Sequence, residues 1–276
     1  MHSGPTTTLA DVDRVARGLW PLSGAEAWDA PGLLVGDPAA RVSRIRLAVD
    51  AVLETADEAV AAGDDLLLVH HPLLLRGVTA VAEDRGKGAV IARLIRSGCG
   101  LIAAHTNADV VGSGTSAVLA ERLGLQGIEP IAAGADGGTG LGRVGDLPAS
   151  ISLGDLARRL AELLPATATG IRGSGEWDAP IRRVAVCAGA GDSLLAHPAV
   201  LGADAYVTRD LRHHPASEAR ENARLGGGPA LLDTSHWASE WLWLEVAAAE
   251  LRAALPDVAV TVSDLRTDPW DFAVTQ

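Results

Sequence analysis

The segment Leu66–Val69 is a run of four apolar residues, and His70, His71 and Pro72 follow it directly. Such a run predicts a strand buried on both faces, which the proline ends because it has no N–H to donate. Ligand sites of open α/β sheets lie beyond the carboxyl ends of the strands. Neighbouring side chains of an extended chain point to opposite sides, so both histidines reach one site only if the chain bends there. The alternative is a strand that ends in two solvated or core-bonded histidines.

The strand with the two histidines belongs to a predicted β-α-β unit. Arg44–Val49 is expected to be its first strand and Ala51–Ala62 its helix, so its two strands should run parallel. Gly100–His105 has the pattern of a third strand, and it also ends on a histidine. The other elements expected in this half are helices at Leu9–Leu19, Ala89–Ser97 and Thr115–Leu123, and a strand at Leu33–Asp37.

The second half of the chain partly repeats this pattern. Arg182–His214 again gives a strand, a helix, a Gly-Ala-Asp turn, a strand at Ala205–Thr208 and a His-His pair. This repetition suggests two related α/β lobes. Gly124 and the glycines from Gly134 to Gly145 are expected to form a linker. Gly140–Gly145 fits G-x-G-x-x-G, but no strand precedes it, so a turn and a strand start are expected there. Further elements expected are helices at Leu153–Leu164 and His236–Leu255, strands at Val184–Val186, Ala230–Leu232 and Val258–Val262, and a loop at Gly173–Gly175.

Composition excludes several classes of partner. The chain of 276 residues has a net charge of −12 and no basic block, which argues against a nucleic-acid partner. No apolar run reaches the roughly 18 residues of a membrane helix, so no membrane partner is expected. Met1–Leu9 lacks the basic and apolar regions of a signal peptide. Cys99 and Cys187 lie far apart outside any C-x-x-C, which predicts a cytoplasmic protein without a cysteine-rich zinc site.

Some catalytic classes are excluded in the same way. Lys87 is the only lysine, and no Ser or Thr follows it as a P-loop requires. A Schiff-base mechanism would depend on that single residue. No G-x-S-x-G elbow is present, so a serine hydrolase of that type has no support.

Histidines and carboxylates recur at the expected strand ends. His236 and Glu240 are four residues apart and share one face of a helix, and His105 and Asp109 have the same spacing. Each such pair alone is common at a surface or a helix cap. The full set is His70, His71, His105, Asp109, His236 and Glu240. Imidazole and carboxylate without sulfur suit zinc, manganese or iron better than calcium or magnesium. Six candidates exceed the needs of one tetrahedral ion, so two divalent metal ions per chain are expected.

Three blocks of the chain carry a family resemblance. His70–Leu74, His105–Asp109 and Ser235–Glu240 resemble the signature blocks of the type 2 GTP cyclohydrolase I family, also called Nif-three-like dinuclear metal proteins. Trp28–Leu33 is similar to the amino-terminal block of that family, and Thr208–Asp210 with the His-His pair is similar to its second-lobe block. The similarity extends over about residues 9 to 270 in the expected order.

The resemblance implies a fold and a ligand set. The fold is α/β, with two related lobes of mixed sheets flanked by helices and the metal site between the lobes at strand carboxyl ends. Residues 1–127 with 236–276 would form the first lobe, and residues 128–235 the second. The implied metal ligands are His70, His71, Asp109, His236 and Glu240. Glu240 would bridge the ions, and His105 would line the site as a candidate sixth contact.

The resemblance also implies a reaction and an assembly. Metal-activated water would open the purine imidazole ring of GTP and release formate, so the expected partner is a small-molecule substrate, with a nucleotide as the candidate. His105 and His214 are the candidate proton carriers, and Arg76 or Arg209 could hold the triphosphate. The family usually has glycine where Arg209 and Ser235 stand. The alternative is a non-catalytic scaffold that binds metal or a protein partner.

A toroidal homohexamer is implied as well. Trp237 and Trp241 share one face of the expected helix, and Trp243 points elsewhere. One aromatic face must pack on the sheet, and the other is expected to pack against a neighbouring subunit, because aromatic residues are enriched at interfaces.

Overall fold

A computed structural model describes residues 7–134 and 137–274, so most of the segment examined for a signal peptide lies outside the described residues. The chain divides into two compact units. The first comprises the residues up to Ala108 together with Leu244–Thr267, and the second comprises Asp109–Trp243 together with the residues from Asp268 onward. Within the described residues, no helix has the length and apolarity needed to cross a membrane.

The first unit is built on a five-stranded sheet, counted over the described residues, with the order β1-β4-β3-β2-β11. Its strands are β1 (Gly32–Val35), β2 (Arg44–Ala48), β3 (Leu66–Val69), β4 (Gly100–Ala103) and β11 (Ala259–Val262). Neighbouring strands from β4 to β11 are parallel, and β1 pairs antiparallel with β4. All four residues of β3 and of β4 are buried. The predicted fully buried central strand and the parallel β-α-β unit are therefore confirmed.

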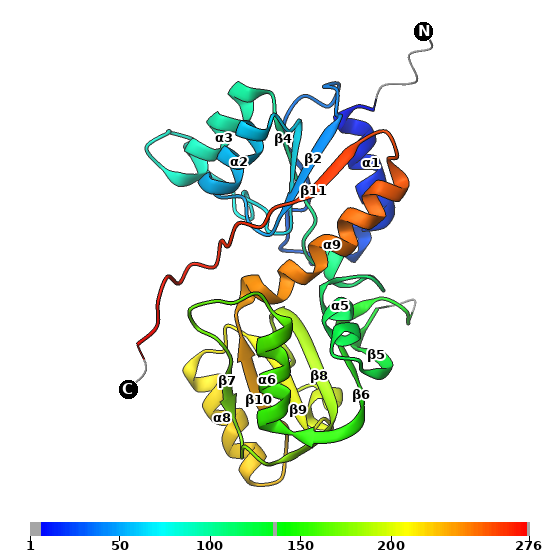
Figure 1. The fold of residues 1–276 in the computed structure, drawn as a ribbon, viewed down its shortest axis with the longest axis vertical. Coiled ribbons are helices and arrows are strands. Elements are labelled where there is room, and N and C mark those ends of the chain that lie inside the picture. Colours follow the sequence, from blue (N-terminus) through cyan, green and yellow to red (C-terminus); the bar gives the residue numbers. More distant parts are fainter. Residues whose placement is uncertain (1–6, 135–136, 275–276) are drawn as a thin grey trace. The chain divides into compact units, whose positions relative to one another are not determined.

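Helices cover both faces of this sheet. Figure 1 shows α2 and α3 on one face, and α1 with the carboxyl half of α9 on the other. The bounds are α1 (Leu9–Leu19), α2 (Leu53–Ala62), α3 (Gly86–Ser97), α4 (Thr106–Asp109) and α9 (His236–Ala254), with a 3-10 turn η1 at Leu22–Gly24. Thr8 caps α1 by accepting a hydrogen bond from the Asp11 N–H, and the Asp11 side chain accepts one from the Thr8 N–H. The predicted helix at Leu9–Leu19 is confirmed.

The second unit is built on a six-stranded mixed sheet, counted over the described residues, with the order β5-β6-β8-β9-β10-β7. Its strands are β5 (Gln126–Ala133), β6 (Gly140–Ser152), β7 (Arg172–Ser174), β8 (Pro180–Ala190), β9 (Ala205–Arg209) and β10 (Ala230–Thr234). The pairs β8–β9 and β9–β10 are parallel, and the other pairs are antiparallel. Two α/β units with mixed sheets flanked by helices are thus confirmed.

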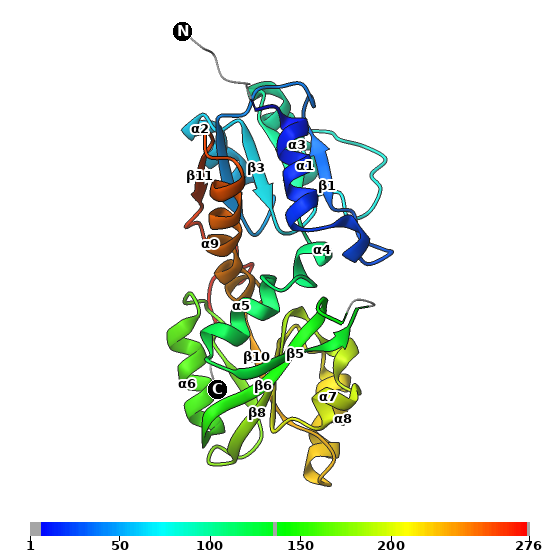
Figure 2. The same cartoon turned by 90° about the vertical axis from the view of Figure 1, so that its right-hand side faces the viewer.

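Helices pack on both faces of the second sheet as well. Figure 2 shows α6 on one face and α7 with α8 on the other. The bounds are α5 (Thr115–Arg122), α6 (Leu153–Leu163), α7 (Pro198–Leu201) and α8 (His213–Arg224), with a 3-10 turn η2 at Asp192–Leu194. One buried core cluster joins Val144, Ala185, Val200, Tyr206 and Leu231, so it links four strands with α7.

In both units, an aspartate before one parallel strand accepts hydrogen bonds from the backbone of the preceding strand. In the first unit, Asp65 Oδ2 accepts hydrogen bonds from the backbone N–H groups of Ser43 and Arg44, where β2 begins. In the second unit, Asp204 Oδ2 accepts bonds from the N–H groups of Arg182 and Arg183 in β8. In both units the aspartate stands just before the next parallel strand. The sequence repetition therefore corresponds to a repeated structural role.

Two expectations about the second unit were wrong, and one strand was not anticipated. The glycines expected to form a linker include Gly140–Gly145, which begin β6, so the strand start expected there is confirmed and the linker is not; residues 135 and 136 lie outside the described residues. β5, which pairs with β6, was not anticipated, because its sequence QGIEPIAA has no clear alternation. The loop at Gly173–Gly175 contains part of β7, which pairs with β10 at the sheet edge. Tertiary pairing supplies the hydrogen bonds that local sequence signals do not reveal.

The lobe boundaries remain a prediction. The sequence placed residues 1–127 and 236–276 in the first lobe, whereas the compact units assign α5 and the first half of α9 to the second unit. Helical periodicity identifies a helix but does not show which sheet the helix packs on.

Candidate metal centre

The chain bends where β3 delivers its two histidines. The His70 and His71 N–H groups both donate to the Val49 carbonyl, at 3.1 and 2.9 Å. The chain therefore leaves the extended geometry that would direct the two side chains to opposite sides. The ring centroids of the two imidazoles lie 5.0 Å apart. The predicted bend is present.

His105 joins this pair from the neighbouring strand. It follows β4 by two residues, and its ring centroid lies 5.2 Å from that of His70 and 5.4 Å from that of His71. The three residues offer nitrogen atoms within 4.8 Å of one another, which is close enough to share a metal ion. His70 is fully buried, and the side chains of His71 and His105 are 26% and 13% exposed. The carboxyl ends of β3 and β4 thus bring three imidazoles together in the first unit.

Each of these imidazoles is oriented through its Nδ1 atom. His70 Nδ1 lies 2.8 Å from the Ala104 carbonyl, His71 Nδ1 lies 2.7 Å from Asp50 Oδ1, and His105 Nδ1 lies 2.8 Å from Asp29 Oδ1. A carbonyl or carboxylate oxygen can only accept, so each Nδ1 carries the proton. The lone pair of each neutral ring is then on Nε2. Metal-binding histidines are commonly oriented in this way by an oxygen acceptor, so the donor set fits a divalent metal ion.

Asp29 accepts hydrogen bonds from Thr106 as well as from His105. Burial raises the pKa of its carboxyl, but hydrogen bonds from His105 and Thr106 outweigh this effect and lower the pKa to about 2. The Thr106 N–H donates to Asp29 Oδ2 at 3.0 Å, and the Thr106 hydroxyl donates to the same oxygen. Asp29 is therefore ionised at neutral pH and accepts the hydrogen bond from His105 Nδ1 as a carboxylate.

The second unit contributes a histidine and a glutamate from one helical turn. His236 Nε2 lies 3.0 Å from Glu240 Oε1, so the predicted pairing of these two residues at the start of α9 is confirmed. His236 Nδ1 lies 2.5 Å from Asp210 Oδ2, and that hydrogen bond lowers the pKa of Asp210. His236 therefore has the same Nδ1-to-oxygen orientation as the three histidines of the first unit.

Glu240 is almost completely buried, at 1% exposure. A Cβ atom on Gly189 in β8 would stand only 3.0 Å from Glu240 Oε1, and Gly189 has a φ of +90°. Ser239, the residue before Glu240, accepts a hydrogen bond from Arg209 Nη1 at the end of β9. Arg209 is fully buried, which does not support its predicted role in holding a triphosphate.

The other predicted site residues lie in the second unit as well. Asp109 ends α4, is buried, and accepts a hydrogen bond from the Thr115 hydroxyl. His214 is exposed at the start of α8, with its ring centroid 5.3 Å from that of His213. It also lines a pocket of about 400 Å³ with Asp192 and other residues of the same unit. Metal ligation by Asp109 and proton transfer by His214 remain predictions.

The sequence analysis missed the acceptors behind the histidines. Asp29 and Asp210 both lie in the blocks that carried the resemblance, and Asp50 lies two residues after the end of β2. Asp210 is not a glycine but has a positive φ, of 56°. A rule that each metal-binding histidine needs an oxygen acceptor would have directed attention to aspartates near strand ends, but not to particular pairs.

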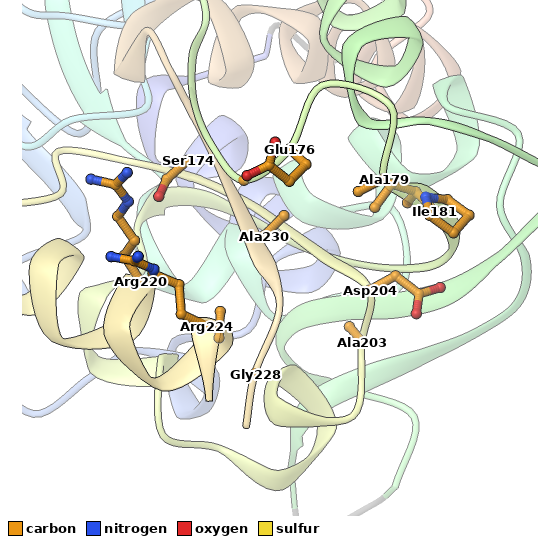
Figure 3. Close-up of a pocket in the computed structure, with 13 residues that line it drawn as sticks. Ser174, Glu176, Ala179, Ile181, Ala203, Asp204, Arg220, Arg224, Gly228 and Ala230 are labelled. Carbon is orange, nitrogen blue, oxygen red and sulfur yellow. The ribbon is translucent and has the colours of Figure 1, made fainter. Parts of the chain in front are cut away.

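The largest pocket described in the second unit lies at the end of the sheet where β8, β9 and β10 begin, away from the strand ends near Glu240. It has a volume of about 610 Å³, and Figure 3 shows Arg220 and Arg224 of α8 on one side and Glu176 and Asp204 around it. Its wall includes residues at the amino ends of β8, β9 and β10. Glu240 lies against Gly189, near the carboxyl end of β8. The pocket is thus separate from the His236–Glu240 pair.

Comparison with known proteins identifies relatives over nearly the whole chain. Residues 7–269 match the family described as Duf34/NIF3 (NGG1p interacting factor 3). A Streptomyces coelicolor protein named GTP cyclohydrolase 1 type 2 homolog is 48% identical over 269 residues, which cover 95% of this chain and 93% of that protein. A protein of the same name from Clostridium perfringens is 31% identical over 96% of this chain and 99% of its own length.

Solved structures show the same fold. The crystal structure of a hypothetical protein from Staphylococcus aureus superposes with a TM-score of 0.88 at 27% identity, covering 98% of this chain and 100% of the other. A Bacillus cereus protein described as related to NIF3 gives a TM-score of 0.87 at 22% identity and supports the fold alone.

Proposed function

The chain belongs to the Duf34/NIF3 family, and we propose that it is a divalent-metal-dependent hydrolase acting on a phosphorylated heterocycle such as GTP. The observation that carries this proposal is the shared orientation of His70, His71, His105 and His236, each with Nδ1 bonded to an oxygen acceptor. Solvated or core-bonded histidines would not need this common arrangement, whereas histidines that bind a metal through Nε2 almost always have it.

The chemistry of the donors supports two ions per chain. Four imidazoles and the carboxylates of Glu240 and Asp109 exceed the ligands of one tetrahedral ion. The assignment of His70, His71, Asp109, His236 and Glu240 as ligands, with Glu240 bridging, follows the family resemblance. Zinc, manganese or iron suits this oxygen and nitrogen set. Bound divalent metal would supply a Lewis acid and lower the pKa of water toward neutrality.

His105 is proposed to move a proton during turnover. Its Nδ1 donates to the ionised Asp29, so Nε2 is the nitrogen that is left to accept a proton. His105 is also a candidate metal contact through the same Nε2. His105→Ala separates these roles: a proton carrier is lost with metal content unchanged, whereas a ligand is lost together with metal.

The position of Trp28 favours a substrate with a flat ring. Trp28 is 59% exposed, and its ring lies edge-on to His105 with centroids 5.9 Å apart. An exposed indole beside the histidines offers a surface on which a purine ring can stack. Arg76, which is exposed in the loop after β3, remains the proposed phosphate contact.

The test combines metal content with turnover. Elemental analysis of metal-replete protein should give two ions per chain, and Glu240→Ala should lose both ions, whereas Asp109→Ala should weaken one site more. Protein loaded with Mn²⁺ or Zn²⁺ should release formate from GTP and give a fluorescent pterin after oxidation. One ion or none per chain would refute the dinuclear centre. Fully loaded protein that leaves GTP intact would refute the cyclohydrolase activity, and a wider nucleotide screen would then decide between another hydrolase and a scaffold.

A homohexamer is proposed from the family resemblance alone. The aromatic argument does not support it, because Trp237 and Trp243 are buried within the chain at 5% and 0% exposure, and the Trp237 ring lies 6.4 Å from that of Trp241. Light scattering at micromolar concentration should report six copies of 28.3 kDa. A monomer would refute the proposal.

A further inference from the structure

A buried arginine stands at the carboxyl end of β9 in the second unit. Arg209 is fully buried, and it pairs in register with Ala190 of β8 and Thr234 of β10. Its Nη1 donates to the Ser239 hydroxyl, while Nε and Nη2 have no hydrogen-bond partner within the described residues. A guanidinium removed from water is costly unless a nearby negative charge compensates it. The position therefore requires a counter-charge in its surroundings.

Glu240 is the group that meets this requirement. It follows Ser239 in α9, is 1% exposed, and places Oε1 beside Gly189, the neighbour of the Ala190 that pairs with Arg209. Among the charged groups around Arg209, Glu240 acts most strongly to raise the pKa of Arg209, against the burial that lowers it. Asp210 acts in the same direction but less. The carboxylate and the guanidinium are thus two opposite charges buried at the same strand ends.

We propose that Arg209 is the internal counter-charge of Glu240, which stabilises the buried carboxylate in the metal-free protein and opposes any cation that binds to it. The first half of this inference concerns the protein alone. The second half rests on the proposed metal-binding function. Arg209 is therefore a positioning residue with two effects. It stabilises the metal-free protein, and it lowers the affinity of Glu240 for cations.

Neutral replacements at Arg209 should change stability and affinity in opposite directions. Without the guanidinium, the buried carboxylate of Glu240 loses a compensating positive charge, so the metal-free protein should unfold at lower temperature. A divalent cation would then meet the carboxylate without a competing positive charge. We expect Arg209→Met to bind Mn²⁺ at least about tenfold more tightly than the wild type, because the like charges of a guanidinium and a cation a few ångströms apart repel by more than that factor. The rise in melting temperature on adding Mn²⁺ should also be larger.

The first measurement uses the chelator-treated protein and denaturant unfolding. Arg209→Met, Glu240→Gln and the double variant form a cycle, in which the double variant should lose less stability than the sum of the single losses. Arg212→Met is the matched control, because Arg212 has a side chain 77% exposed and pairs with Asp192 on the surface. Additive losses across the Arg209–Glu240 cycle would overturn the inference, whether or not the protein binds metal.

The second measurement is competition titration with Mn²⁺ and a chelator. Arg209→Lys keeps the charge and should retain an affinity near that of the wild type, whereas Arg209→Met should bind more tightly. Arg209→Gln is a second neutral variant, which repeats the measurement if Arg209→Met is not recovered folded. Unchanged or weaker Mn²⁺ binding by the neutral variants would overturn the inference. Wild-type protein without any Mn²⁺ affinity would refute the proposed function and the second half of the inference, while the unfolding cycle would still decide the first half.

Discussion

In the first unit, three imidazoles come from the ends of two strands, and each is held by an oxygen acceptor from another part of the chain: Ala104, Asp50 or Asp29. In the second unit, His236 and Glu240 come from one helical turn and contact each other at 3.0 Å. The first arrangement depends throughout on hydrogen bonds across long sequence separations. The second combines helical spacing, a small neighbour and a buried arginine with one such contact, from His236 Nδ1 to Asp210. Long-range orientation thus positions all the donors of the first unit, whereas local geometry positions Glu240 in the second.

Removing one imidazole from the first unit should have the largest effect. His71→Ala should lower metal affinity by about 100-fold or more, above the range for losing an outer hydrogen-bond partner. It should also abolish any hydrolysis. The side chain is 26% exposed and ends a strand, so the melting temperature of the metal-free protein should change little. His213→Ala, at an exposed position on α8, is the control and should retain metal. Full metal content in His71→Ala would contradict its assignment as a ligand.

Removing a charge behind an imidazole should have a smaller effect. Asp29→Asn keeps an acceptor oxygen near His105 but loses the carboxylate charge, so metal affinity or turnover should fall by about tenfold. Because the folded-state pKa of Asp29 is about 2, below its ordinary value of 3.8, its stabilisation is present above about pH 4 and is lost as the pH falls toward 2. After allowance for solvent screening, we expect the ionised Asp29 to contribute about 1–2 kcal/mol to the free energy of unfolding above this pH range.

The acid dependence of Asp29→Asn can be checked by denaturant unfolding from pH 5 to pH 2. The wild type should lose more stability than Asp29→Asn over this range, since the variant has no carboxyl to protonate at that position. Equal slopes for the two proteins would show that Asp29 does not hold the ionised form that its hydrogen bonds predict.

Crowding the carboxylate of the second unit should have the smallest effect. Gly189→Ala places a methyl group 3.0 Å from Glu240 Oε1 and adds strain at a φ of +90°, so we expect about 1–2 kcal/mol of destabilisation and a few-fold loss of metal affinity. Gly170→Ala is the control: its φ of +57° gives similar strain, but no atom lies within 4 Å of the added group. If both variants bind metal equally, the space at Gly189 does not position Glu240.

The buried strands and the histidines at their ends could be predicted because their signals are local. Leu66–Val69 is apolar at every position, and His236 and Glu240 have helical spacing, so neither interpretation needs a distant partner. β5 and β7 could not be predicted in this way, because their hydrogen bonds come from β6 and β10. The same limit applied to the acceptors: Asp29 is 76 residues from His105 in sequence, and no local pattern joins them.

The split composition of the first unit has a consequence for the order in which the chain folds. β11 closes the edge of the first sheet by pairing with β2, and the Thr261 hydroxyl donates to the Ile45 carbonyl across 216 residues of sequence. All strands of the second sheet precede β11 in the chain, so a ribosome completes that sheet first. During synthesis, one edge of β2 therefore stays unpaired until the last part of the chain emerges. An unpaired strand edge can pair with another chain, so the nascent protein is exposed to aggregation during this interval.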